Sequence, residues 1–339
     1  MHGAKILVLL SCLLFVCGQV AAQEPENELA DAHSLLQQGK NVEAIQRLKA
    51  LAVRHPETKS VNHELGIAYY HQGEYLEAAK YLQEAWREDP EDRDAAQLLG
   101  LSYYSSGKPA EAIPPLAKVR LWHRDEGIDA IYILGLCYIL TRSYAQARET
   151  FAELYRLPPD SAEAHLVVAR MLLRQGFDAV AEEEARKALA ISPQMPLAHF
   201  TLGEYAVYKA DYTMAAQEFE SEVVLNRGYA PAHTSLAEAY WQLGRYADAE
   251  RVVQRSIWLD STNAKSYVLM GRVLHKKGQL AAAQRTVQQA IALDAGSYTA
   301  HYLLGQIFRE EGKPDAADRE MKVAARIQQQ QGPNARNRQ

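Results

Sequence analysis

The chain has 339 residues, of which 48% are apolar, 23% charged and 9% aromatic. These proportions are typical of a folded, soluble protein with a sizeable core, and they exclude a wholly disordered chain, a collagen and a multi-span membrane protein. Lys and Arg number 37 against 42 Asp and Glu, a net charge of −5 with no long basic block, so nucleic acid is not expected as a partner.

Residues 1–22 have the pattern of a secretory signal peptide. Lys5 precedes a largely apolar run, residues 6–17, and small residues end at Ala22, just before Gln23. A run of this length is too short to cross a bilayer core of about 30 Å as a helix. We therefore expect cleavage after Ala22 and export, to the periplasm or the exterior if the source is bacterial. The alternative is a segment retained as a membrane anchor.

Between residues 23 and 327 the chain repeats itself. A small residue recurs nine times, at intervals of 34 residues with one interval of 35: Ala32, Gly66, Gly100, Gly135, Ala169, Gly203, Ala237, Gly271 and Gly305. An alanine follows each of them by twelve residues, and a glycine follows most of them by seven. The pattern predicts nine units of two helices joined by a turn, starting near residues 25, 59, 93, 128, 162, 196, 230, 264 and 298. Residues 328–339 are polar and are expected to form a disordered tail.

The units resemble tetratricopeptide repeats. The second unit shows the resemblance in six residues: Leu65, Gly66, Tyr69, Ala78, Ala85 and Pro90. The resemblance implies an all-α fold, a right-handed superhelical solenoid of about nine helix-turn-helix repeats. One unit cannot bury its own apolar face, so we expect the units to stack into a single continuous solenoid.

In solenoids of this family the first helix of each repeat lines a concave groove. The groove-facing positions, which we call the first-helix stripe, lie three residues before the recurring small residue and one, four and five after it. The stripe is apolar and aromatic in the second to fourth repeats, and it alternates charges with aromatic residues later. Its candidate partner-binding residues are His63, Ile67, Tyr70, Leu101, Tyr104, Tyr132, Leu136, Ile139, Arg170, Arg174, Tyr208, Glu238, Trp241 and Arg272.

Exposed apolar patches usually mark contact sites, and Tyr and Trp contribute strongly to binding at protein interfaces. We therefore expect a protein or peptide segment in the groove. Its apolar side chains would pack on Tyr70, Tyr104 and Tyr132, while the arginines of the stripe would select acidic residues. In the alternative, tight curvature lets the stripe side chains pack on one another.

The sequence contains no pattern that indicates catalysis, a cofactor or a metal. There is no Gly-rich phosphate loop and no recognisable catalytic set. Four histidines recur at the repeat spacing, His165, His199, His233 and His301. Successive helix pairs lie at least about 8–10 Å apart, too far for these histidines to share one metal ion. Cys137 lies in an apolar segment and is expected in the core, and the acidic run 182–184 is expected to face solvent.

The third unit departs from the pattern. Pro114 and Pro115 fall inside its expected second helix, which should kink or start late and form a joint in the solenoid. The following segment contains Trp122 and Arg124, a candidate lateral docking point; the alternative is a local irregularity without a role.

Together these features predict an exported, non-enzymatic scaffold that binds partner proteins or peptide segments in its groove. Contact with a membrane is expected only through the signal peptide, or through the retained anchor of the alternative. The alternative function is an outer-membrane assembly or export accessory, similar to tetratricopeptide proteins that support pilus or polysaccharide secretion.

Overall fold

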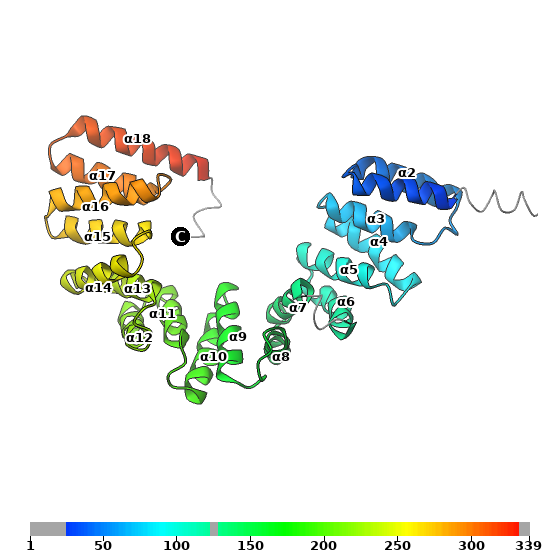
Figure 1. The fold of residues 1–339 in the computed structure, drawn as a ribbon, viewed down its shortest axis with the longest axis horizontal. Helices are drawn as coiled ribbons and strands as arrows, with labels where there is room; N and C mark the ends of the chain where they lie inside the picture. Colours follow the sequence, from blue (N-terminus) through cyan, green and yellow to red (C-terminus); the bar gives the residue numbers. More distant parts are fainter. Residues whose placement is uncertain (1–24, 123–127, 332–339) are drawn as a thin grey trace, which may run out of the picture. The chain divides into compact units, whose positions relative to one another are not determined.

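The structure, a computed structural model, describes residues 25–122 and 128–331. All regular structure in these residues is helical, and the helices follow one another in nine pairs (Figure 1). The chain divides into two compact units, Met1–Pro159 (unit 1) and Asp160–Gln339 (unit 2). The expected signal peptide and Arg124 lie outside the described residues.

Unit 1 contains four helix pairs within its described residues. Residues 25–37 form the first helix, which is followed by α2 (Asn41–Arg54), α3 (Val61–His71), α4 (Tyr75–Glu88), α5 (Arg93–Ser105), α6 (Pro109–Trp122), α7 (Ile128–Leu140) and α8 (Tyr144–Leu154).

Unit 2 contains five pairs within its described residues. They are formed by α9 (Ala162–Arg174), α10 (Asp178–Ile191), α11 (Ala198–Tyr208), α12 (Tyr212–Leu225), α13 (Ala230–Gln242), α14 (Tyr246–Leu259), α15 (Ala264–Lys276), α16 (Leu280–Leu293), α17 (Tyr298–Glu310) and α18 (Pro314–Gln331).

Within each unit the pairs stack in chain order. The first helix of a pair packs on its own second helix and on the first helix of the next pair, as α13 packs on α14 and α15, and the second helix also packs on the next first helix, as α14 packs on α15. The apolar face that one pair leaves open is thereby covered by the next. This is the all-α solenoid of helix pairs that the repeats predict.

The recurring small residue lies where the two helices of a pair cross. A Cβ atom added to Gly203 would lie 2.4 Å from Cε1 of Phe219 on the second helix, so no larger residue fits there. Where the position holds alanine, that residue is packed with the paired second helix, as with Ala237, which clusters with Val253. The 34-residue spacing of small residues therefore has a steric cause, the close approach of two helices.

The turn between the two helices needs a left-handed backbone. Seven glycines have φ between +71° and +77° there: Gly39, Gly73, Gly107, Gly176, Gly244, Gly278 and Gly312. In the two repeats without glycine, Arg142 and Ala210 take the same place with φ of +62° and +56°. These two turns are strained, because a Cβ disfavours positive φ.

The structure contradicts the late start that was one of two outcomes expected for the second helix of the third unit; the other, a kink at the prolines, stays a prediction. Helix α6 begins at Pro109 and continues through Pro114 and Pro115, so it does not start late. Its repeat lies inside unit 1, and the chain divides at Pro159 instead of at these prolines. A proline at the first position of a helix lacks only an N–H that has no helical partner, which suits Pro109 as the start.

The end of the solenoid also extends further than expected. Helix α18 reaches Gln331, so residues 328–331 of the predicted disordered tail are helical. Glutamine has good helix propensity, and the helix can continue over these residues without further packing. None of the helices in the described segments has the length and hydropathy needed to cross a bilayer.

Candidate functional site

In unit 1 the first-helix stripe presents three partly buried tyrosines. Tyr70 of α3 contacts Tyr75 edge to face, with ring centroids 5.6 Å apart, and burial raises the pKa of the Tyr70 hydroxyl. Tyr132 of α7 contacts Phe151 in the same way at 5.8 Å. The pKa of Tyr104 in α5 is raised, first by burial and then by the nearby Cys137 thiol and Tyr132 hydroxyl. Each ring thus packs on the core with one side and stays partly exposed on the other.

Two of the predicted partner-binding residues belong to the core. Leu136 is 5% exposed and Ile139 is fully buried, so neither offers a surface to a partner. Helix α7 is apolar along most of its length, and burial there extends beyond one stripe. Ile67 and Leu101, the matching residues of α3 and α5, remain partly exposed. Cys137 is buried as expected, and burial raises the pKa of its thiol to about 12, which keeps it protonated and unreactive.

His63 has a local structural role. Its Nδ1 lies 2.6 Å from Oδ2 of Asp92, and Oδ1 of the same carboxylate accepts the backbone N–H of Ala95 at 2.9 Å. Asp92 is the N-cap of α5, so the histidine of one repeat holds the helix cap of the next.

Trp122, the candidate lateral docking residue, is engaged within unit 1. Its indole N–H donates to Oε2 of Glu91 at 3.1 Å, and the Lys118 ammonium and the Arg93 guanidinium lie 4.9 and 5.8 Å from its ring centroid. The ring is partly buried between these groups. Its position is therefore explained by internal contacts.

In unit 2 four stripe residues meet in a hollow of about 280 Å³, which we call the α9–α11 hollow. One wall is α9, with Arg170 and Arg174 one turn apart, and the other is α11, with Glu204 and Tyr208. Tyr208 is 66% exposed. The concave surroundings remove water from Glu204 and raise the pKa of its carboxyl, an effect that the two arginines oppose in part.

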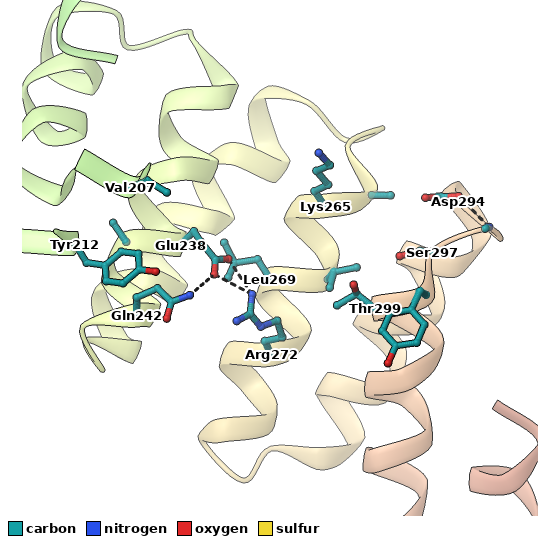
Figure 2. A pocket seen from close by; sticks show the side chains of 15 residues that line it. Val207, Tyr212, Glu238, Gln242, Lys265, Leu269, Arg272, Asp294, Ser297 and Thr299 are labelled. Carbon is teal, nitrogen blue, oxygen red and sulfur yellow. Dashed lines mark hydrogen bonds and ion pairs between the residues drawn. The ribbon is translucent and has the colours of Figure 1, made fainter. Parts of the chain in front are cut away.

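A second and larger hollow, about 530 Å³, extends over α13, α15 and α17. Figure 2 shows Glu238, Gln242 and Arg272 meeting at one end of it, with Lys265, Ser297 and Thr299 toward the other. Nη1 of Arg272 donates to both carboxylate oxygens of Glu238, at 3.0 and 2.9 Å. The guanidinium also stacks on the indole of Trp241, 3.6 Å from its centroid.

These contacts separate the arginines of the stripe into two classes. The charge of Arg272 is neutralised by Glu238, and one face of its guanidinium is covered by Trp241. An acidic partner residue would therefore gain little from pairing with it. Among the described residues, Arg170 and Arg174 form no ion pair with a carboxylate within 4 Å. The sequence alone, which placed all three arginines on one stripe, did not show this difference.

Three of the four recurring histidines bond within their own repeats, and the fourth, His233, has Nε2 3.2 Å from the backbone oxygen of Arg227. His165, His199 and His301 each place Nδ1 2.6–2.7 Å from a glutamate oxygen on the paired second helix; these glutamates are Glu184, Glu218 and Glu320. The two residues of each pair are 19 positions apart in the chain, a spacing that is visible when the repeats are aligned. In the described part of the chain, His, Cys, Asp and Glu form no group of three that could hold a metal ion.

Glu184 corrects the expectation for the acidic run, because it is buried and 4% exposed. Burial alone would raise the pKa of its carboxyl. Hydrogen bonds from His165 and Lys187 outweigh burial, and the pKa is lower than usual.

The sequence of these repeats can be compared with known families. A tetratricopeptide-repeat profile matches residues 29–93, 132–196, 200–264 and 268–331, and a second profile of the same description matches residues 69–133. The chain belongs to the tetratricopeptide repeat family. No curated protein sequence matches it significantly.

Some solved structures are similar to this chain over part of its length. A fragment of MamA from Desulfovibrio magneticus RS-1 is 18% identical with a TM-score of 0.47, covering 51% of this chain and 98% of that one. PilF of Pseudomonas aeruginosa is 22% identical with a TM-score of 0.47, covering 58% and 90%. YrrB, described as a protein with an unusual peptide-binding site, is 21% identical with a TM-score of 0.46, covering 54% and 93%.

Proposed function

We propose that this tetratricopeptide-repeat protein is an exported, non-enzymatic scaffold that binds segments of partner proteins on its first-helix stripe. The observation that carries the proposal is the α9–α11 hollow. Two guanidinium groups one turn apart face a cavity of about 280 Å³, and no carboxylate of the described residues pairs with them. Arginine forms two parallel hydrogen bonds with a carboxylate, so this pair suits an acidic residue of a bound segment.

Neighbouring groups support a protein ligand. Tyr208, which is mostly exposed, and Leu173 border the same hollow and can contact the apolar part of a segment. Glu204 places a negative charge beside the arginines, which favours a segment in which a basic residue is close to the acidic one. Such alternation fixes the direction of a bound chain more than it raises affinity.

We expect the double variant Arg170→Ala, Arg174→Ala to weaken partner binding about tenfold or more. The acidic residue of the partner would lose the charge-assisted hydrogen bonds that the two guanidinium groups donate. The measurement is a pull-down with the tagged full-length protein from its source cells, followed by titration of the purified partner. The control is Arg186→Ala, Arg251→Ala, which removes two exposed arginines that pair with Glu182 and Asp248 on second helices.

Partner binding that survives loss of Arg170 and Arg174 but responds to the control variant would move the site off the first-helix stripe. The same pull-down separates the scaffold from the alternative function. One or two defined partners support the scaffold, whereas co-purification with pilus or polysaccharide secretion components supports an assembly or export accessory.

Export is a separate part of the proposal and rests on the N-terminal sequence. We expect the protein outside the cytoplasm with Gln23 as its first residue, because the apolar run 6–17 and the small residue Ala22 suit signal peptidase. Mass spectrometry of the N-terminus in fractionated cells measures this. An intact Met1 on a cytoplasmic protein would contradict it.

A further inference from the structure

A third hollow in unit 2 lies on the other side of α15 from Arg272. It measures about 400 Å³ and opens between α14 and α16, with Ile257, Tyr267 and Met270 as its apolar lining and Gln254, Arg285 and Gln289 around them. Met270 and Arg272 are two residues apart, about 200° around the helix, and so face opposite sides. This α14–α16 hollow is therefore distinct from the first-helix stripe.

The hollow coincides with an interruption in the repeat pattern. At the positions of Tyr267 and Thr286, which both line it, the next repeat has His301 and Glu320. Those two residues form a hydrogen bond of 2.6 Å that ties the first helix to the second. In the repeat of α15 and α16 an apolar ring and a small hydroxyl residue replace that polar pair, and the surface between the helices is apolar.

An exposed tryptophan lies on α14, one turn from a residue that lines the hollow. Trp258 is 71% exposed and lies one turn after Gln254 on the same side of α14. The Arg255 guanidinium stacks on its ring, 4.0 Å from the centroid. The cation holds the ring in place. Trp and Arg are two of the residue types that contribute most to binding at protein interfaces.

The charged residue in the lining of the hollow is Arg285. One repeat earlier, Arg251 is paired with Asp248 three residues before it, but the residue three before Arg285 is Ala282. As a result Arg285 has no ion pair within the described residues, and neither has Arg255. Arg285 lines the hollow from α16, whereas Arg255 is on α14 and lies over the ring of Trp258. Together they complement acidic groups on a segment that fills the hollow and continues over the tryptophan.

We infer that the α14–α16 hollow is a second docking site, which binds a partner-protein segment with a bulky apolar side chain flanked by acidic residues. The apolar side chain enters between Ile257, Tyr267 and Met270. The acidic residues pair with Arg255 and Arg285, and the segment covers the face of Trp258. A scaffold with such a site contacts two segments at once, one on the first-helix stripe and one on the outer side of α15.

The test uses the full-length protein and short fluorescent peptides in which a Phe is flanked by Glu, in an Ala, Ser and Gln background. Fluorescence anisotropy is expected to show binding about tenfold tighter than for peptides with Lys in place of Glu or Ala in place of Phe. Trp258→Ala and Arg285→Glu should each weaken this binding about tenfold. The matched control is Arg319→Glu, which reverses the charge at the equivalent exposed position of α18.

Three outcomes would overturn the inference. The first is no saturable binding of the Glu–Phe–Glu peptide up to about 1 mM. The second is binding that is lost in the Arg170→Ala, Arg174→Ala variant and kept in Trp258→Ala, which would place the peptide on the first-helix stripe. The third is self-association in sedimentation velocity that Trp258→Ala abolishes, which would make a second copy the occupant. Circular dichroism verifies folding, and Trp258 and Arg285 are exposed enough for both variants to fold.

Discussion

Replacing Gly203 with Leu is expected to lower the free energy of unfolding of unit 2 by about 2–3 kcal/mol. A Cβ at this position would lie 2.4, 2.6 and 2.8 Å from three ring carbons of Phe219, all closer than van der Waals contact. Phe219 is 1% exposed and contacts Phe200, so its ring has little room to retreat. The higher helix propensity of Leu, worth about 1 kcal/mol over Gly, offsets only part of this strain.

Urea denaturation followed by circular dichroism and tryptophan fluorescence measures the effect; Trp241 and Trp258 lie in unit 2. The double variant Gly203→Leu, Phe219→Ala is the control, because it removes the ring that the new side chain would strike. We expect it to be more stable than the sum of the two single effects predicts. Strict additivity would mean that residues 203 and 219 do not oppose each other at the helix crossing.

The helix crossings could be predicted from sequence because they impose the same steric limit in every repeat. Gly203 and Ala237 stand at matching positions, and each packs with a side chain of the paired second helix, Phe219 or Val253. Because every repeat needs a small residue at its helix crossing, small residues recur at a fixed spacing along the one sequence. Helix starts and turn glycines are visible for the same reason.

The candidate site was less predictable because it depends on single contacts. Arg170 and Arg272 occupy the same position in their repeats, yet only Arg272 is covered, because Glu238 and Trp241 are its neighbours one repeat earlier. Ile139 lies on the expected stripe but is buried, because α7 is apolar on several sides. Periodicity gives the direction of a side chain and does not give its neighbours in the adjacent repeat.

Glu222 shows a further contact that the repeat pattern does not reveal. It is fully buried, at a position where the neighbouring repeats have Ala188 and Ser256. Its Oε1 accepts the backbone N–H of Leu197 at 3.0 Å, and Oε2 accepts that of Phe200 at 3.2 Å. These are N–H groups at the start of α11, whose N-cap residue provides no side-chain acceptor. A carboxylate of α12 thus caps the preceding helix.

Replacing Glu222 with Ala is therefore expected to lower the free energy of unfolding of unit 2 by about 2–4 kcal/mol, because two largely buried N–H groups lose their acceptor. Glu222→Gln should cost about half as much, since its single carbonyl oxygen can satisfy one of the two N–H groups. The measurement is urea denaturation of both variants. The control is Glu218→Ala, one turn earlier on α12, which removes a more exposed carboxylate bonded to His199.

A cost for Glu222→Ala no larger than that for Glu218→Ala would mean that water caps α11 equally well. The outcome bears on function, because α11 carries Glu204 and Tyr208, one wall of the α9–α11 hollow. Fraying of its first turn would loosen the helix opposite Arg170 and Arg174. A variant that keeps unit 2 folded but weakens partner binding would then show that the buried cap of α11 positions the hollow as well as stabilising the fold.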